Sequence, residues 1–385
     1  RETSEFQDKL RKELEKLKPQ TITPGKIIKD KVTNGVYKVQ KDGLSVEFTK
    51  SVSKNASVKI PDTIKVNGIT CKVTGISANA FKNNVSLRTV TIGKNVTIIG
   101  TNAFYGCKKL SKVNGANNVV KIGNNSFTNC GSLSSITVSE TVRIIGKQAF
   151  YNCKNLISLA DTGIESWVLP NVTEGSAVFY NCTQLQSANL ERWNPTKIVN
   201  LPWLFYGCEN LQEFSLDGWR VPSLLSLQQA FSSCTKLEVI DLSSWTEIHS
   251  LNSLYGTFSG CTNVKEIRIP NIKSGFKTMF FYFTFDECTS LELLDISGWI
   301  LDGCNEKVAN SGGAFDLTTV FWGNTYPAGP FTLLADNWEV TVDEVLTNAD
   351  QKLEVPWYDS RTDFKANVSI NNWNLNNTVQ DLSGL

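Results

Sequence analysis

Ten cysteines are the residues of this sequence best suited to chemistry, and eight of them share one position of a repeated phrase. The phrase is Phe-x-x-Cys-x-x-Leu, and its cysteines are Cys107, Cys130, Cys153, Cys182, Cys208, Cys234, Cys261 and Cys288. A metal site needs ligands that converge, usually in CxxC-like pairs, and one position per repeat does not supply them. Parallel side chains would make the disulfide torsion awkward, although the spacing does not forbid disulfides. We therefore favour buried thiols that pack as small apolar groups, with disulfides as the alternative and no metal or other cofactor.

Two cysteines, Cys71 and Cys304, lie outside the repeated position and could pair with each other or stay free. Free thiols in an exported protein would fit an anaerobic habitat, because oxidising surroundings favour disulfides.

The acid–base groups do not form a recognisable catalytic set. His249 is the single histidine, and spacing assigns it no serine or cysteine partner, so we expect a structural role. Asp217, Asp241 and Asp295 recur between apolar residues and are expected to face solvent. Catalysis would require a cleft and a second group that we cannot identify. A non-enzymatic protein is therefore expected, with a polysaccharide-active enzyme as a remote alternative.

The phrase that carries the cysteines is an internal repeat. Its phenylalanines are Phe104, Phe127, Phe150, Phe179, Phe205, Phe231, Phe258 and Phe285, and an earlier copy at Phe81 has Asn84 in the cysteine position. Successive cysteines are 23 to 29 residues apart. That period is typical of solenoids, and the leucine-rich-repeat range covers it.

Each repeat also predicts one short strand. After the leucine, apolar residues alternate with polar ones, as in Ile136-Thr-Val138 and Ile240-Asp-Leu242. One such strand per coil predicts a continuous parallel sheet along a leucine-rich-repeat solenoid, with strands about 4.8 Å apart. The phenylalanine and cysteine columns then form a core ladder that no single coil could bury alone.

Two columns of aromatic residues admit both a structural and a functional interpretation. Trp193, Trp219, Trp245 and Trp299 end the later strands, and we favour core filling at a corner over an exposed strip for a glycan or a protein. Tyr105, Tyr151, Tyr180 and Tyr206 follow the repeat phenylalanine, where polar residues stand in other copies, so exposure is expected there. Both columns are kept as a candidate binding surface.

The expected organisation has four parts. Residues 1–24 form a helix and linker, 25–72 a β-rich cap with turns at Asp42-Gly43 and Asn67-Gly68, 73–300 the solenoid, and 301–385 irregular longer coils with a C-terminal cap. Within the last part, the phrases ending in Trp338 and Trp373 resemble the repeat strand, so we expect the sheet to continue through them.

The overall charge gives no sign of a polyanionic partner. The net charge is +1, so neither a nucleic acid nor an anionic membrane is expected as a partner. No apolar run reaches the roughly 18 residues of a membrane helix. The chain starts at Arg1, and we expect that a signal or anchor segment has been removed.

The unit Ile-Gly-x-x-Ala-Phe-x-x-Cys-x-x-Leu, seen at residues 145–156, resembles the leucine-rich repeat of BspA-like bacterial surface proteins. The later Leu-Asp-Leu-Ser-x-Trp coils resemble a sister repeat of the same group. The resemblance implies a secreted or cell-surface location and adhesion to host matrix or cell-surface proteins. A carbohydrate-binding module using the Trp and Tyr columns is the alternative. The resemblance assigns no ligand-contact residue.

Overall fold

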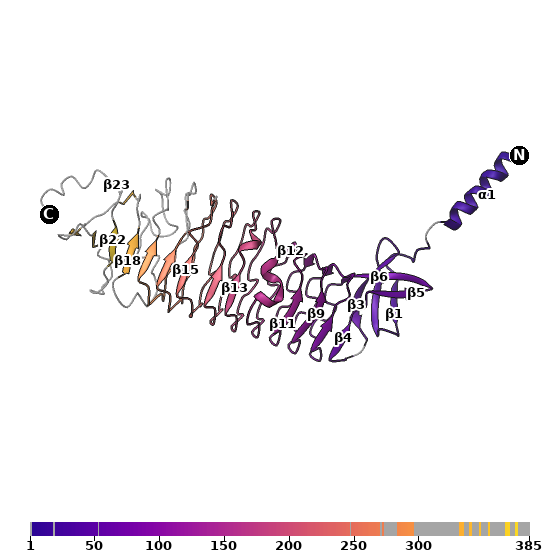
Figure 1. The fold of residues 1–385 in the computed structure, drawn as a ribbon, viewed down its shortest axis with the longest axis horizontal. Helices are drawn as coiled ribbons and strands as arrows, with labels where there is room; N and C mark the ends of the chain where they lie inside the picture. Colours follow the sequence, from indigo (N-terminus) through magenta and orange to yellow (C-terminus); the bar gives the residue numbers. More distant parts are fainter. Residues whose placement is uncertain are drawn as a thin grey trace.

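The computed structural model describes residues 2–17, 20–52, 54–246, 248–269, 272 and 283–295, and six short strands of the C-terminal segment. Its coils stack along one long axis (Figure 1), and the leucine-rich-repeat solenoid expected from the repeat is confirmed. Helix α1 (Glu2–Leu17) precedes the coils, and its Phe6 and Leu10 side chains are exposed. The i, i+4 spacing of Phe6 and Leu10 places them on one face of that helix.

A small mixed sheet, antiparallel except between β3 and β6, covers the N-terminal end of the solenoid. Its strands are β1 (Ile27–Asp30), β2 (Gly35–Val39), β3 (Ser45–Ser51), β5 (Thr63–Val66) and β6 (Ile69–Ile76). Asp42 accepts hydrogen bonds from the backbone N–H groups of Leu44 and Ser45, and Asn67-Gly68 closes the β5–β6 hairpin with positive φ at both residues. Strand β3 pairs parallel with β6, so the cap continues directly into the first coils.

The early coils contribute two parallel ladders instead of the one that was expected. The first consists of β4 (Ser57–Lys59), β7 (Thr89–Thr91), β9 (Lys112–Ala116) and β11 (Ser135–Val138). The second continues the cap sheet from β6 through β8 (Ile98–Ile99), β10 (Lys121–Ile122) and β12 (Ile144–Ile145). In the coils of β8, β10 and β12 the second ladder ends in an isoleucine directly before a glycine, and these isoleucines, Ile99, Ile122 and Ile145, are buried in the core.

The sheet is segmented, which differs from the continuous sheet expected. Strands β13 (Ser187–Asn189) and β14 (Glu213–Ser215) pair separately from β15 (Val239–Asp241), β16 (Glu266–Arg268) and β17 (Leu293–Asp295). Between β11 and β13 the longer repeat forms the 3-10 turns η1 (Ala160–Thr162) and η2 (Ile164–Ser166), and η3 (Glu191–Trp193) follows β13. The extra residues of this coil are accommodated by turns, which replace a paired strand there.

The expected continuation of the sheet into the C-terminal segment is confirmed. Strand β18 (Phe331–Leu334) pairs parallel with β17, and β22 (Ala366–Ser369) pairs parallel with β18. Strands β20 (Leu346–Thr347) and β21 (Leu353–Glu354) add antiparallel to β22, and β19 (Glu339–Val340) pairs with β23 (Asn374–Leu375).

The repeat phenylalanines form the axis of the core. They are buried, with exposed fractions of 3% or less, and the cap residue Phe48 extends their column by one ring. Consecutive ring centroids from Phe48 to Phe285 lie 5.0–6.0 Å apart. This spacing is within the range of favourable aromatic pairs, so each coil is stabilised mainly by its two neighbours.

Candidate functional site

The cysteine column is structural. Each of the eight repeat cysteines is buried and donates a hydrogen bond from its Sγ to the backbone carbonyl of the phenylalanine one coil earlier, at 3.1–3.2 Å. All nine cysteines in the described part of the chain are free thiols, as buried packing predicts, and Cys304 lies outside that part. Burial raises the pKa of Cys107, Cys182 and Cys261 to about 12. These thiols therefore stay protonated near neutral pH. Because a cysteine nucleophile or metal ligand must be a thiolate, the column is not suited to either role.

The described tryptophans of the repeat column are buried, as the favoured core filling predicts, and the alternative of an exposed binding strip is wrong for them. Trp193, Trp219 and Trp245 have exposed fractions of 3%, 0% and 2%. Each Nε1–H donates to a backbone carbonyl 29 residues earlier at 2.9 Å, which satisfies its one polar atom. Trp167, which the repeat pattern did not identify, is also buried and stacks on Trp193. These residues fill a corner of the core, and Trp299 lies outside the described residues.

The tyrosines lie at the surface, but their ring faces are covered. Tyr151, Tyr180 and Tyr206 are half-buried and stack on one another, with centroids 4.4 and 4.6 Å apart and rings within 7° of parallel. Burial and the two neighbouring phenols raise the pKa of Tyr180 to about 12. Tyr105 stands apart from this stack, with the Lys82 ammonium 5.4 Å from its ring centroid. The two stacking contacts cover four of the six π faces of these three rings, which are the surfaces that a sugar would stack on.

The candidate acid–base residues are not brought together. His249 is exposed, and within the described residues it has no hydrogen-bond or ion-pair partner. Asp217 accepts a hydrogen bond from Ser244 Oγ at 3.1 Å, on an exposed surface. No group of three His, Cys, Asp or Glu side chains in the described coils could hold a metal ion. Asp217 and Asp241 each contact a serine hydroxyl on an exposed surface, and His249 joins neither pair in the described contacts, so the residues of a hydrolytic site are not assembled from these candidates.

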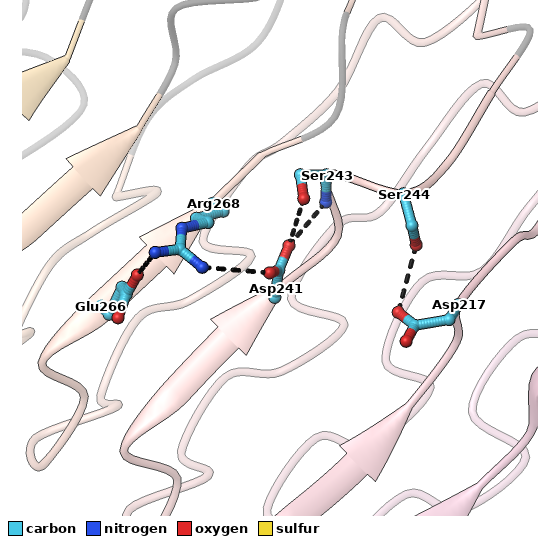
Figure 2. A network of polar contacts seen from close by, with 6 residues as sticks. All are labelled: Asp217, Asp241, Ser243, Ser244, Glu266 and Arg268. Carbon is cyan, nitrogen blue, oxygen red and sulfur yellow. Dashed lines mark hydrogen bonds and ion pairs between the residues drawn. The ribbon is translucent and has the colours of Figure 1, made fainter.

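Asp241 is held ionised by its neighbours (Figure 2). It accepts hydrogen bonds from the Ser243 N–H and Oγ at 2.9 and 2.6 Å, and Arg268 approaches it at 3.4 Å. Burial raises the pKa of Asp241, but the Ser243 hydrogen bonds and the Arg268 cation outweigh it, so that the pKa lies below its usual value. Arg268 also forms an ion pair with Glu266 on its own strand. A carboxylate stabilised as an anion is a poor general acid, so this network suits polar recognition.

We call the surface formed by the outward side chains of β4, β7, β9, β11 and β13–β17, and by the residues flanking these strands, the sheet face. The first column of this face consists of the residue directly after each core leucine, and the second column consists of the next residue. In both columns, cations in early coils give way to carboxylates in later coils. In the first column Arg88 is replaced by Glu238 and Glu292 in later coils. In the second, Lys112 is replaced by Glu213 and Glu266. Since the backbone position is the same, the fold does not require either sign.

The same separation holds for the sequence of residues 54–295 as a whole. Residues 54–154 contain 14 Lys and Arg against two acidic residues, a net charge of +12. Residues 155–295 contain eight Lys and Arg against 15 acidic residues, a net charge of −7. All 14 cations are exposed, and only Lys94 forms an ion pair with a described residue, Asp62, at 3.6 Å. The whole-chain charge of +1 concealed this asymmetry, which a count by coil would have found.

Two family models match the chain, one over the early coils and one over the later coils. Residues 74–162 match the family described as "BspA type Leucine rich repeat region", in six copies, and residues 146–271 match "Mycoplasma protein of unknown function, DUF285". No curated protein matches the chain. Among the described residues, no helix combines the length and the apolar character needed to cross a bilayer.

Several solved structures are similar. A leucine-rich-repeat protein of T. pallidum is 28% identical, with 55% of this chain and 91% of that chain covered and a TM-score of 0.44. A leucine-rich cell-surface protein of Faecalibacterium prausnitzii A2-165 is 16% identical, with 92% and 96% covered and a TM-score of 0.39. A leucine-rich-repeat protein of Bacteroides capillosus is 25% identical over 31% of this chain and 86% of that one, with a TM-score of 0.28.

Proposed function

We propose that this chain, which belongs to the BspA-like leucine-rich-repeat proteins, is a non-enzymatic surface protein that binds a protein partner through its sheet face. We further propose that it acts outside the cell or on the bacterial surface. Its partners there would be host matrix or cell-surface proteins, and its role would be adhesion.

One observation carries the proposal: an invariant core supports an outward column whose residues change from coil to coil. The phenylalanine and cysteine positions are the same in eight coils. The position directly after the core leucine reads Arg88, Ser111, Ser134, Ile157, Gln186, Gln212, Glu238, Lys265 and Glu292. Such variation on a fixed backbone is what a recognition surface needs, because each coil can then offer a different contact to one large partner.

A glycan is a weaker candidate for the ligand. Sugar recognition by aromatic residues depends on open ring faces, and here three tryptophans are buried and three tyrosines stack face to face. The sheet face instead offers carboxylates, guanidinium groups and hydroxyls on rigid strands, as in the Asp241 network. These groups are typical of the polar rim of protein interfaces.

The test is a surface plasmon resonance screen of the purified chain against immobilised extracellular-matrix and cell-surface proteins, followed by two matched variants. Val239 lies on the sheet face in β15 and is 46% exposed, and Ile144 lies on the second ladder in β12 and is 42% exposed. Val239→Arg is expected to weaken binding at least tenfold, because a buried unpaired charge opposes docking. Ile144→Arg adds the same charge on another face and is expected to change binding less than twofold.

Three results would contradict the proposal. The first is that no protein binds. The second is that Ile144→Arg, and not Val239→Arg, abolishes binding, which would move the site to the second ladder. The third is a glycan that binds and shifts the tryptophan emission. A protein bound to the sheet face should leave that emission unchanged, because the described tryptophans of the repeat column are buried.

A further inference from the structure

Four charges in two columns of the sheet face are arranged symmetrically, with opposite signs, about one coil. That coil carries Ile157 in the first column after the core leucine, where its side chain is 49% exposed. Three coils before it the same column holds Arg88, and three coils after it holds Glu238. In the second column, Lys112 lies two coils before and Glu213 two coils after. All four charged residues are exposed.

Backbone contacts keep the coils in register along the first column on either side of the interruption after β11, and across it the rings of Phe127 and Phe150 stack 5.4 Å apart. The carbonyl of Arg88 accepts from the N–H of Ser111, and that of Ile157 accepts from Gln186. The carbonyl of Glu238 likewise accepts from Lys265. With strands about 4.8 Å apart, Arg88 and Glu238 each lie about 14 Å from the Ile157 coil, and Lys112 and Glu213 about 10 Å from it.

A two-fold axis along the strand direction through the Ile157 coil would make this surface self-complementary. Such an axis reverses the solenoid direction but keeps each column opposite the same column of the second copy. Arg88 then meets Glu238 of the other copy, and Lys112 meets Glu213, each pair twice. The exposed Ile157 side chains meet on the axis. A parallel arrangement would instead bring Arg88 toward Arg88, so like charges select the antiparallel one.

We infer that the sheet face binds a second copy of this chain, as an antiparallel two-fold dimer centred on Ile157. The later coils, which carry the acidic half of the sheet face, keep a negative charge although Lys265 lies among them. Lys265 pairs with Glu238 at 2.9 Å and also interacts with Glu292, so one cation faces two carboxylates. The Arg268 cation is likewise engaged by Asp241 and Glu266. An anionic polymer would use only the basic half of the face, whereas a second copy uses both halves.

The size of this contact predicts a weak, reversible dimer. Seven coils from Arg88 to Glu238 span roughly 30 Å, and the outward residues of one coil span roughly 17 Å. The two copies would therefore bury about 1,000 Å² in total, at the low end of specific interfaces. Because the charges are at the surface, the dimer should be sensitive to salt.

The experiment is sedimentation velocity of the full chain at 2–100 µM in 50 and 500 mM NaCl, with two charge-reversed variants. The first carries Arg88→Glu with Lys112→Glu, and the second carries Glu213→Lys with Glu238→Lys. The control carries Lys72→Glu with Lys121→Glu, which changes the net charge as the first variant does but lies on the second ladder and the cap strand β6. Circular dichroism checks that each variant folds.

We expect the wild type and the control to dimerise in 50 mM NaCl and to dissociate in 500 mM. Each reversed variant alone should bind its own copies at least tenfold more weakly, because like charges then face each other in all four contacts. An equimolar mixture of the two variants should dimerise again, since all four pairs are then oppositely charged, two with their native signs and two with the signs exchanged. Three results would overturn the inference. They are a wild type that is monomeric at 100 µM in 50 mM NaCl, a dimer whose affinity neither reversed variant changes, and a mixture of the two variants that stays monomeric. A monomer that binds heparin, and loses that binding with Arg88→Glu and Lys112→Glu, would overturn it in favour of an anionic polymer.

Discussion

Raising the pH from 8 to 10 should unfold this protein, because its core contains a column of eight thiols that cannot ionise while buried. Burial raises the pKa of Cys107, Cys182 and Cys261 from 9.0 to about 12, and that of the other five repeat cysteines well above 9.0. The unfolded chain therefore releases protons above pH 9 that the folded chain retains. Stability that is fully present below pH 9 is lost progressively between pH 9 and 12, since the unfolded state binds fewer protons there.

The magnitude follows from the number of thiols. One pKa unit corresponds to about 1.4 kcal/mol, so at pH 10, one unit above its pKa, each unfolded thiol favours unfolding by about 1.3 kcal/mol relative to pH 8. Eight thiols together lower the free energy of unfolding by about 10 kcal/mol relative to pH 8, if the array unfolds as one unit. That loss is comparable to the whole stability of an ordinary domain, which is about 5–15 kcal/mol.

The assay is urea denaturation at pH 7, 8, 9 and 10 with a reductant present, followed by far-UV circular dichroism. Up to pH 10 the buried phenols of Tyr37 and Tyr180 contribute less than the thiols, because an unfolded phenol starts to ionise only near its ordinary pKa of 10.0, although burial raises the folded pKa of both to about 12. As a control, Cys182→Ala with Cys208→Ala removes two of eight thiols and should reduce the pH dependence by about a quarter. A free energy of unfolding that stays constant from pH 8 to 10 would refute the reasoning. So would thiolate absorbance appearing at pH 9 while the dichroism remains native.

Three further predictions concern the core. Phe205→Ala should cost about 3–5 kcal/mol in urea denaturation, because the ring is fully buried between two others; a cost below 1 kcal/mol would mean that neighbouring coils do not depend on the stack. Trp219→Phe should cost about 1–3 kcal/mol by leaving the Leu190 carbonyl without its 2.9 Å donor, and an unchanged denaturation midpoint would contradict that role. Gly163→Ala should prevent native folding as judged by thermal melting, since the new Cβ would lie 1.8 Å from a backbone oxygen. Gly68→Ala has a similar φ and open space around it, so it should cost only about 1–2 kcal/mol, and equal effects of the two glycine changes would count against the packing argument.

Much of the fold follows from the sequence because a solenoid repeats one local solution. The recurrence of phenylalanine, cysteine and leucine at a fixed period predicted stacked coils, a strand after each leucine and a core of aligned side chains. It also predicted that β18 and β22 would continue the sheet, although their coils are longer. The buried thiols were predicted as well, since a single column cannot surround a metal ion.

The candidate site was predicted less well. Trp219 and its equivalents were assigned both to the core and to a binding strip, because an aromatic residue after a strand has the same spacing in either case. Their burial depends on the path of the coil 29 residues earlier, which supplies the carbonyl partner of each indole. The stacking of Tyr151 on Tyr180 likewise depends on the distance between coils.

What the sequence determined by itself is the set of local and periodic features. These are the coil length, the identity of the core columns and the change of charge sign between residues 54–154 and 155–295, although that last feature becomes visible only when charges are counted by coil. Tertiary structure alone decided which faces are open, where the sheet is interrupted, and which residues of different coils become neighbours. Those properties depend on how one coil sits on the next, and the residues of a single repeat carry no information about that stacking until the neighbouring coils are in place.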